Sequence, residues 1–328
     1  MDVAGIGTPY FDQLCSIDVL PKTDASVHTL ESSWQYGGKV STALAALARL
    51  GHTGAIHANV GGIFGKCIRL DFLRHGVDCT HLKDVPGTQS NVCICLAEKS
   101  TGGRSFVGFR NPAGVPEITA GELDKTALLT AGWLLVENLR ETSALAASWF
   151  REAGKQVVVD SDSLLPETIE NMPLVDHFLA SQYTYSSLYG DDENYENNLR
   201  ALRAMQKNER AVTVVTLGAN GLAGIDEAGR YFRQSAYKVD VVDTTGAGDV
   251  FHGAYIAGRL DGLDAEGACR YAQAAAAVKC TRLGGRAGIP TRGQLAEFME
   301  TGNTRFMEHD ERAAYYCEPP FERAMGQT

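Results

Sequence analysis

The sequence predicts an α/β protein, with a three-layer, doubly wound, mostly parallel sheet and a small β-sheet lid. Apolar strand-like runs alternate with helix-like periodic stretches through most of the chain. Such alternation indicates a parallel sheet with helices on both faces. Two stretches, at about residues 11–34 and 85–109, read instead as short strands with no helix between them. These strands are expected to form the lid.

The elements of the main sheet follow from the same patterns. Strands are expected at Val3–Gly7, Thr53–Val60, Trp133–Glu137, Gln156–Asp160, His177–Ser181 and Ala211–Leu217. Helices are expected at Ser41–Leu50, Phe64–Arg74, Thr142–Glu152, Ala247–Arg259 and Ala265–Cys280. Glycine just past a helix end is the usual stop signal, and Gly51, Gly76 and Gly154 follow three of these stretches. Ligands of such a sheet bind beyond the carboxyl ends of its strands.

The lid and the two ends of the chain complete the predicted organisation. Ser90–Leu96 and Arg104–Phe109 are expected to form a hairpin around the loop at 98–103. Exposed lid edges would allow a homodimer, because pairing covers them. Residues 1–300 are interpreted as one domain that includes the lid, and residues 301–328 as a C-terminal extension. The extension has clustered charges and no clear period, so a docked tail, a disordered tail and an oligomer contact stay open.

Composition and charge narrow the classes of function. The 328 residues include 40 acidic and 30 basic side chains, a net charge of −10, which argues against a nucleic-acid or membrane-surface binder. No apolar run approaches the ~20 residues of a membrane span, and the first residues lack the basic start of a signal peptide. The eight cysteines are scattered, without a C-x-x-C pair. We therefore expect a cytoplasmic protein.

The strongest chemical signal is the run Val241-Val242-Asp243-Thr244-Thr245-Gly246-Ala247-Gly248-Asp249. Small residues follow a β-rich run and lead into a helix, so Gly246, Ala247 and Gly248 lie at a helix N-terminus whose free N–H groups attract an anion. Asp249 lies in the first turn, where the helix dipole favours its ionised form. A carboxylate beside an anion site makes sense when it takes a proton from a hydroxyl while the N–H groups hold the developing phosphate charge.

Other phosphate-binding motifs do not match the chain. The run at 61–67, Gly-Gly-Ile-Phe-Gly-Lys-Cys, has the wrong spacing for a Walker loop. A dinucleotide fingerprint needs a third glycine, but Phe251 stands there after Gly248 and Tyr10 stands there after Gly7.

The run Asp243–Asp249 resembles the C-terminal signature of the ribokinase/PfkB carbohydrate kinase family. Three further segments support the resemblance, which extends from about residue 3 to residue 300. Residues 37–43 resemble the family's double-glycine motif, residues 216–221 its T-x-G-x-x-G turn, and residues 282–290 its closing segment. The family fold is a three-layer α/β domain with a β lid, as the patterns predict.

The resemblance implies roles on the phosphate side. Asp249 would be the base that activates the acceptor hydroxyl, and Gly246, Ala247 and Gly248 would form the anion hole for the γ-phosphate. ATP would be bound by Thr216, Gly218 and Gly221, with Ser181 nearby on the nucleotide side. Asp243 and Thr245 match the positions that hold a monovalent cation such as K⁺ in ribokinase-like members. Mg²⁺ would be bound mainly through the ATP phosphates and water.

The resemblance also implies roles on the acceptor side. Asp12 would bond sugar hydroxyls, Gly37 and Gly38 would let the sugar approach the backbone, and Lys39 and Thr42 would contact it. Arg104 of the lid and Glu137 at a strand end are weaker candidates. Each has a structural alternative: Asp12 as a turn cap, Arg104 as a solvated charge and Glu137 as a member of an ion pair.

The chain departs from the family pattern at three places that matter, one of which is Val60-Gly61-Gly62, where many members carry an acid. Thr42 stands where an Asn usually reads the sugar, so hydrogen bonding to the substrate differs. Ser181-Gln182-Tyr183-Thr184 replaces an Asn-Glu-x-Glu segment that helps to organise Mg²⁺. This variant, the lead-in at 33–38 and Leu135-Val136-Glu137 are similar to ketohexokinase-type members, which mildly favours a ketose.

The sequence thus predicts ATP-dependent phosphorylation of a primary hydroxyl of a small sugar or sugar derivative. One alternative is a nucleoside kinase of the same family, with an aromatic platform from Tyr10, Phe11, Trp34 and Tyr36. The other is a non-catalytic regulator that binds a sugar or nucleotide on the same fold.

Overall fold

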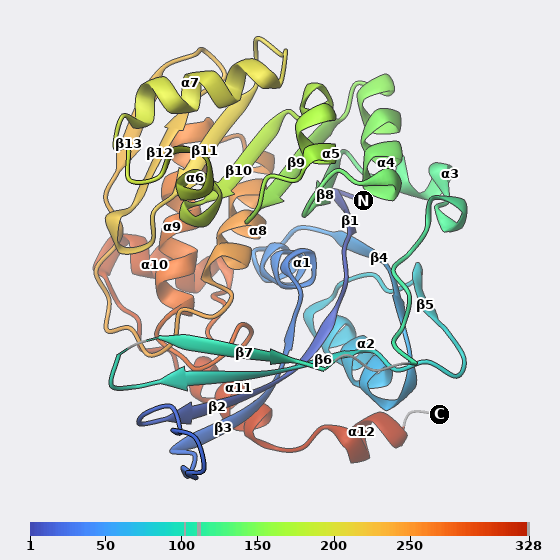
Figure 1. The fold of residues 1–328 in the computed structure, drawn as a ribbon, viewed down its shortest axis with the longest axis vertical. Coiled ribbons are helices and arrows are strands. Elements are labelled where there is room, and N and C mark those ends of the chain that lie inside the picture. Colours follow the sequence, from blue (N-terminus) through green and yellow to red (C-terminus); the bar gives the residue numbers. More distant parts are fainter. Residues whose placement is uncertain (102, 110–112, 327–328) are drawn as a thin grey trace.

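The computed structural model describes residues 1–101, 103–109 and 113–326. Its described part contains a nine-stranded sheet with the order β13-β12-β11-β10-β9-β8-β1-β4-β5 and a separate four-stranded sheet with the order β3-β2-β6-β7. Helices cover both faces of the larger sheet (Figure 1). The smaller sheet lies below it in the view of Figure 1 and forms the predicted lid. The predicted fold class is confirmed.

The larger sheet is parallel from β11 to β5, and only its β11–β12–β13 edge is antiparallel. Its strands are β1 (Val3–Ile6), β4 (Gly54–Val60), β5 (Leu82–Asp84), β8 (Trp133–Val136), β9 (Gln156–Ser161), β10 (His177–Ser181), β11 (Val212–Thr216), β12 (Leu222–Ile225) and β13 (Tyr231–Gln234). The α-helices are α1 (Lys39–Arg49), α2 (Gly62–His75), α3 (Lys125–Leu128), α4 (Glu141–Glu152), α5 (Pro166–Glu170), α6 (Gln182–Tyr189), α7 (Tyr195–Met205), α8 (Ala247–Leu260), α9 (Ala265–Lys279), α10 (Arg292–Thr301), α11 (Met307–Cys317) and α12 (Phe321–Met325). None of the described helices is long and apolar enough to cross a membrane.

Every expected strand and helix of the main domain is present within about two residues of its expected bounds. The prediction omitted β5 at one edge of the sheet, and β12 and β13, the antiparallel strands at the other edge. These strands have three or four residues each, which is too short to show a period in the sequence.

The lid consists of β2 (Tyr10–Ile17), β3 (Glu31–Gly37), β6 (Asn91–Glu98) and β7 (Arg104–Gly108). β6 and β7 pair antiparallel as the expected hairpin, although Gly102 of the loop lies outside the described residues. β2 pairs with β6 in parallel along its whole length. Two segments far apart in the chain therefore form one sheet, as predicted.

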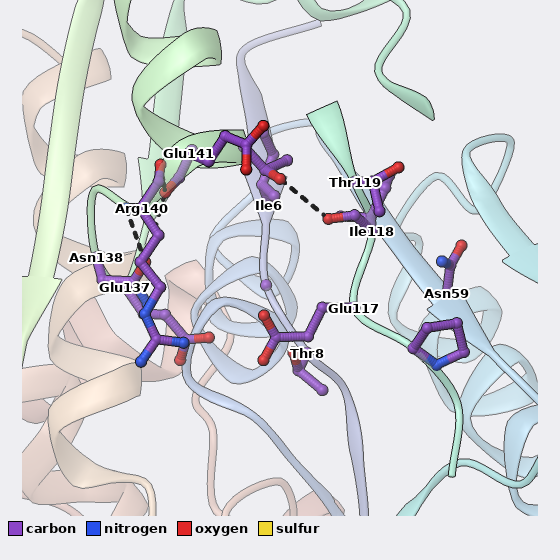
Figure 2. Close-up of a pocket in the computed structure, with 14 residues that line it drawn as sticks. Ile6, Thr8, Asn59, Glu117, Ile118, Thr119, Glu137, Asn138, Arg140 and Glu141 are labelled. Carbon is purple, nitrogen blue, oxygen red and sulfur yellow. Dashed lines mark hydrogen bonds between the residues drawn. The ribbon is translucent and has the colours of Figure 1, made fainter. Parts of the chain in front are cut away.

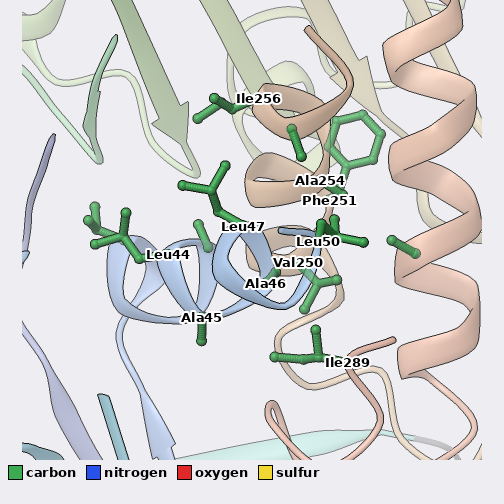
Figure 3. Close-up of a cluster of buried hydrophobic side chains, with 14 of the residues drawn as sticks. Leu44, Ala45, Ala46, Leu47, Leu50, Val250, Phe251, Ala254, Ile256 and Ile289 are labelled. Atoms are coloured by element: carbon green, nitrogen blue, oxygen red, sulfur yellow. The ribbon is translucent and has the colours of Figure 1, made fainter. Parts of the chain in front are cut away.

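Helices α1 and α8 pack directly against one another in the core. Figure 3 shows α1 lying across α8, with Ala46 and Leu47 of α1 on the side of Val250 and Ala254 of α8, and all four side chains are buried. A Cβ on Gly253 would overlap the carbonyl oxygen of Ala43, so the two backbones approach as closely as glycine permits. This contact fixes the start of α8 relative to the start of α1.

The C-terminal extension is docked in the structure. Helix α11 contacts β3, and α12 contacts α2. The side chains of His309, Arg312, Tyr316 and Ala324 are buried. Of the alternatives left open by the sequence, the docked tail describes residues 301–326.

Candidate active site

The turn at 243–248, called here the anion-hole loop, leads into helix α8. Gly246 caps the helix with a φ of 73°, a left-handed conformation that is unstrained only for glycine. A Cβ on Gly246 would also lie 3.0 Å from the Cα of Gly285 and 3.6 Å from Cγ2 of Thr42. The loop is therefore held between α1 and the segment that follows α9.

Free N–H groups at the start of α8 make this loop an anion site. The N–H of Ala247 donates to the carbonyl of Thr244 at 3.1 Å. Among the described residues, the N–H groups of Gly246, Gly248 and Asp249 have no acceptor. These groups and the helix dipole attract negative charge. An anion bound here would meet the N–H groups of Gly246, Gly248 and Asp249, whereas the N–H of Ala247 is engaged in the turn.

A cavity of about 820 Å³ opens beside the start of α8. Its wall includes the predicted nucleotide residues Thr216, Gly218 and Gly221, together with Ala247 and Gly248 of the anion-hole loop. The structure therefore brings the predicted nucleotide turn and the predicted phosphate site into one space.

The remainder of this wall was missed from the sequence. It is largely apolar and comes from the segment after β13, from α8 and from α9, with Tyr237, Val239, Val241, Phe251, Ala276 and Ala277. An apolar slot with a polar end is typical of a cofactor or nucleotide site. Ser181 lies opposite Thr216 in the sheet, but its side chain caps α6 and is not part of the wall.

Asp249 follows Gly248 in the first turn of α8. Desolvation raises its pKa, the negative charge of Asp160 raises it further, and His252 and Lys39 act in the opposite direction. The helix dipole was expected to favour the ionised form, but burial and a neighbouring carboxylate outweigh it. A raised pKa suits a carboxylate that must accept a proton near neutral pH.

Four charged side chains beside Asp249 form what we call the acceptor-side cluster: Lys39, Asp160, Asp162 and His252. Nδ1 of His252 lies 2.9 Å from Oδ2 of the buried Asp160. Nζ of Lys39 lies 2.7 Å from Oδ2 of Asp162 and 3.8 Å from Oδ1 of Asp160. Although desolvation works against both charges, this pairing lowers the pKa of Asp160 and raises that of His252.

Only Lys39 of this cluster was predicted from the sequence. His252 follows Asp249 by three residues and so lies on the same face of α8. Asp160 is the penultimate residue of β9, and Asp162 begins the bend after it. The carboxyl ends of parallel strands place ligand-binding residues at such positions. Their place at the carboxyl end of a predicted strand could therefore have identified Asp160 and Asp162 as candidate site residues from the sequence.

Asp12, in the lid strand β2, presents its carboxylate to the double-glycine motif. A Cβ on Gly37 would overlap Oδ2 of Asp12, so any larger residue there would displace this carboxylate. Desolvation raises the pKa of Asp12 to about 7, and the positive charge of Arg286 partly offsets the effect. Asp12 belongs to the lid sheet by its backbone, but its carboxylate forms no hydrogen bond within the described part of the chain. It does not cap a turn, and its carboxylate is available to a ligand.

A second cavity, of about 290 Å³, lies beyond the ends of β1 and β8. Figure 2 shows Glu117 and Glu137 pointing into it from different segments. Asn59 also lines it, is 4 % exposed, and has no hydrogen-bond partner on either side-chain amide atom. Desolvation raises the pKa of Glu137, Lys39 lowers it, and Asp160 and Glu117 raise it. These influences place Glu137 between this cavity and the acceptor-side cluster.

Arg104 begins the lid strand β7. Its positive charge lowers the pKa values of the thiols of Cys95 and Cys280, although desolvation raises both. Cys280 lines the nucleotide cavity, and Sγ of Cys95 lies 3.8 Å from Oγ1 of Thr245. The charge of Arg104 therefore acts on residues next to the anion-hole loop, and Arg104 forms no ion pair with the described residues.

The described residues include no group of three or more His, Cys, Asp or Glu side chains that could hold a metal ion. The predicted cation residues Asp243 and Thr245 instead bond to one another. Oδ1 of Asp243 accepts from the N–H of Thr245 at 2.9 Å and from its hydroxyl at 2.7 Å.

Comparison with known proteins gives one consistent result. A family model described as "pfkB family carbohydrate kinase" matches residues 9–292. The chain is 25 % identical over 299 residues to a ribokinase of Haemophilus influenzae, covering 90 % of this chain and 97 % of the relative. It is 23 % identical to the ketohexokinase of Mus musculus, covering 84 % and 94 %. An Escherichia coli protein assigned as a ribokinase II and solved with ATP and Mg²⁺ superposes with a TM-score of 0.76 at 22 % identity, covering 91 % and 99 %.

Proposed function

This chain belongs to the PfkB family of carbohydrate kinases and is an ATP-dependent carbohydrate kinase. From that premise we propose that it phosphorylates a hydroxyl of a small sugar and that Asp249 is the base. The observation that carries the proposal is the position of Asp249. Its neighbour Gly248 lines the nucleotide cavity, while its own pKa responds to Asp160, Lys39 and Asp162 of the acceptor side. The carboxylate thus stands where the two sides meet.

The residues divide the chemistry as follows. Asp249 accepts the proton of the acceptor hydroxyl as the oxygen forms its bond to the γ-phosphorus, and the bond from that phosphorus to the bridging oxygen of ADP breaks. The free N–H groups of Gly246, Gly248 and Asp249 stabilise the charge that develops on the phosphoryl oxygens. Arg104 of the lid, without an ion-pair partner in the described chain, supplies a positive charge above the same loop.

Mg²⁺ would enter with the nucleotide. Because the described residues contain no cluster of metal ligands, the ion would be held by the phosphates and water, with no dedicated protein cage. When bound, it neutralises phosphate charge and so assists transfer.

The acceptor would lie over Gly37, bonded to the carboxylate of Asp12. The unpaired amide of Asn59 and the carboxylate of Glu137 offer further bonds to hydroxyls at its far end. A polyol acceptor fits these groups, and the mild preference for a ketose and for a primary hydroxyl remains a prediction.

Three of the four aromatic residues that would serve a nucleoside, Phe11, Trp34 and Tyr36, pack against the core, whereas Tyr10 is 37 % exposed. Phe11 and Tyr36 are buried, and the ring of Phe11 lies 5.8 Å from Trp34, 5.0 Å from Phe64 and 5.9 Å from Phe321. This cluster fixes the lid to α2 and the tail, which favours a sugar over a nucleoside as the acceptor.

A homodimer through the lid also remains a prediction. β7 is an edge strand of the described sheet, and Phe106 and Val107 on it are 60 % and 52 % exposed. Edge pairing with a second copy would cover both.

The test is ADP release with ATP and Mg²⁺ against a panel of ketoses, aldoses, acidic sugars and nucleosides. Replacing Asp249 by Asn should lower kcat by about 10³-fold on the best acceptor, with an unchanged melting temperature. Asp240→Asn, at an exposed carboxylate just before the anion-hole loop, is the matched control and should retain full turnover. An Asp249→Asn enzyme as fast as the parent would sink the mechanism. A melting shift with ATP but no ADP from any acceptor would favour the non-catalytic regulator.

A further inference from the structure

Lys279, the last residue of α9, carries a wholly buried side chain. Its Nζ donates to the carbonyl oxygen of Asp243 at 2.8 Å. That oxygen belongs to the first residue of the anion-hole loop. A buried ammonium is costly unless it is paired, so its presence at this point of the fold requires an explanation.

The ammonium lies where the sequence predicts a monovalent cation, beside Asp243 and Thr245. The polar atoms that such an ion would use are already engaged. Oδ1 of Asp243 accepts two bonds from Thr245, and Oδ2 accepts the N–H of Gly284 at 2.8 Å. The carbonyl of Asp243 accepts the ammonium of Lys279. The residues present therefore do not fit K⁺.

The charges of Asp243 and Lys279 also indicate that the site does not fit K⁺. Burial alone would raise the pKa of Asp243, but the positive charge of Lys279, with the bonds from Thr245 and Gly284, holds it below the usual value. The buried carboxylate thus has its compensating cation already. A second positive ion within a few ångströms of the ammonium would be repelled in a medium of low dielectric constant.

We propose that the ammonium of Lys279 is a built-in monovalent cation that replaces K⁺ beneath the anion hole. It ties the end of α9 to the anion-hole loop, together with the carbonyl of Cys280, which accepts the N–H groups of Val242 at 2.8 Å and Asp243 at 3.1 Å. The inference rests on the proposed phosphoryl transfer and adds to it that the enzyme works without an added monovalent ion.

The experiment compares the parent with Lys279→Ala in K⁺, NH₄⁺, Na⁺ and tetramethylammonium chloride at constant ionic strength. The parent should release ADP at the same rate in all four salts, within about twofold. The alanine variant leaves a cavity for an ion of the size of the lost ammonium. Its rate should fall by about tenfold or more in tetramethylammonium and recover in K⁺ or NH₄⁺.

Melting temperatures give a reading that needs no turnover. K⁺ should raise the melting temperature of Lys279→Ala above its value in tetramethylammonium, because an ion that binds only the folded state stabilises it. The parent should show no such difference. Lys279→Met fills the space without charge and should be slow in every salt.

Lys155→Ala is the matched control, because Nζ of Lys155 also donates to a backbone carbonyl, that of Ala131, away from the site. It should show no response to K⁺ in rate or melting. A parent that needs K⁺, or whose melting temperature rises specifically with K⁺, would overturn the proposal. So would a Lys279→Ala variant that equals the parent in every salt. Failure of the proposed function looks different, since no acceptor would then yield ADP in any salt while the melting comparison still decides the cation.

Discussion

The nucleotide side and the acceptor side of this site are built in different ways. On the nucleotide side, backbone groups at the start of α8 and an apolar wall from α8 and α9 form the cavity. On the acceptor side, charged side chains from three separate elements meet, namely Lys39 from α1, Asp160 from β9 and His252 from α8, while Asp12 of the lid faces Gly37. The conformation of the backbone therefore determines the geometry of the nucleotide side, whereas the packing of distant segments determines the geometry of the acceptor side.

The largest loss of kcat should come from a change to the backbone of the anion hole, on the nucleotide side. Gly246→Ala puts a Cβ at a φ of 73° and 3.0 Å from the Cα of Gly285, so the loop must move. Removing one well-placed donor costs about 10²–10³-fold in kcat, and we expect a loss of this size for every acceptor. Turnover and melting temperature measured together will check it.

Gly262→Ala provides the control for Gly246→Ala. Gly262 has a φ of 88°, but a Cβ there meets nothing within 4 Å. The strain of the left-handed conformation, about 1 kcal/mol, should appear in the melting temperature while kcat stays unchanged. Equal losses of kcat in both variants would show that stability, not the geometry of the anion hole, explains the result.

The difference between the two sides also explains what could be predicted from the sequence. A glycine that a turn requires, such as Gly246, leaves a local pattern that a short run of residues displays. The contact of Asp12 with Gly37 spans a strand pair. The resemblance pointed to each of the two residues but not to their contact. The partnership of His252 with Asp160 joins α8 to β9 and depends on how the sheet is wound, which no local pattern records. The same holds for Lys279, whose ammonium reaches Asp243 from the far end of another helix.

A smaller and more selective effect is expected from Asp12→Asn. The carboxylate makes no hydrogen bond within the described chain, so we expect the acceptor to be its partner, and a hydrogen bond to a charged group contributes about 1.5–3 kcal/mol. The KM for the sugar should rise by about tenfold to a hundredfold, while the KM for ATP stays constant. Asp18→Asn, at the exposed outer end of β2, should change neither. A rise in both KM values would mean that the two sides are not separable at Asp12.

The smallest effect should be a displacement of the pH profile by His252→Asn. The positive charge of His252 lowers the pKa of Asp249. Without that charge the pKa of Asp249 rises, and more alkaline solution is needed to ionise the base. The acidic limb of kcat should therefore move to higher pH by about half a unit to one unit, with the plateau at high pH preserved.

His309→Asn separates this electrostatic role from a packing role. His309 is also buried but lies in the tail helix α11, where burial lowers its pKa to about 4 and leaves it neutral. Its substitution should lower the melting temperature without moving the acidic limb. If His252→Asn lowers kcat equally at all pH values, His252 only holds Asp160 in place. If the acidic limb of the kcat profile moves to higher pH, the acceptor-side cluster sets the proton affinity of Asp249. The proton-transfer step is then controlled by side-chain charges that belong to no sequence motif.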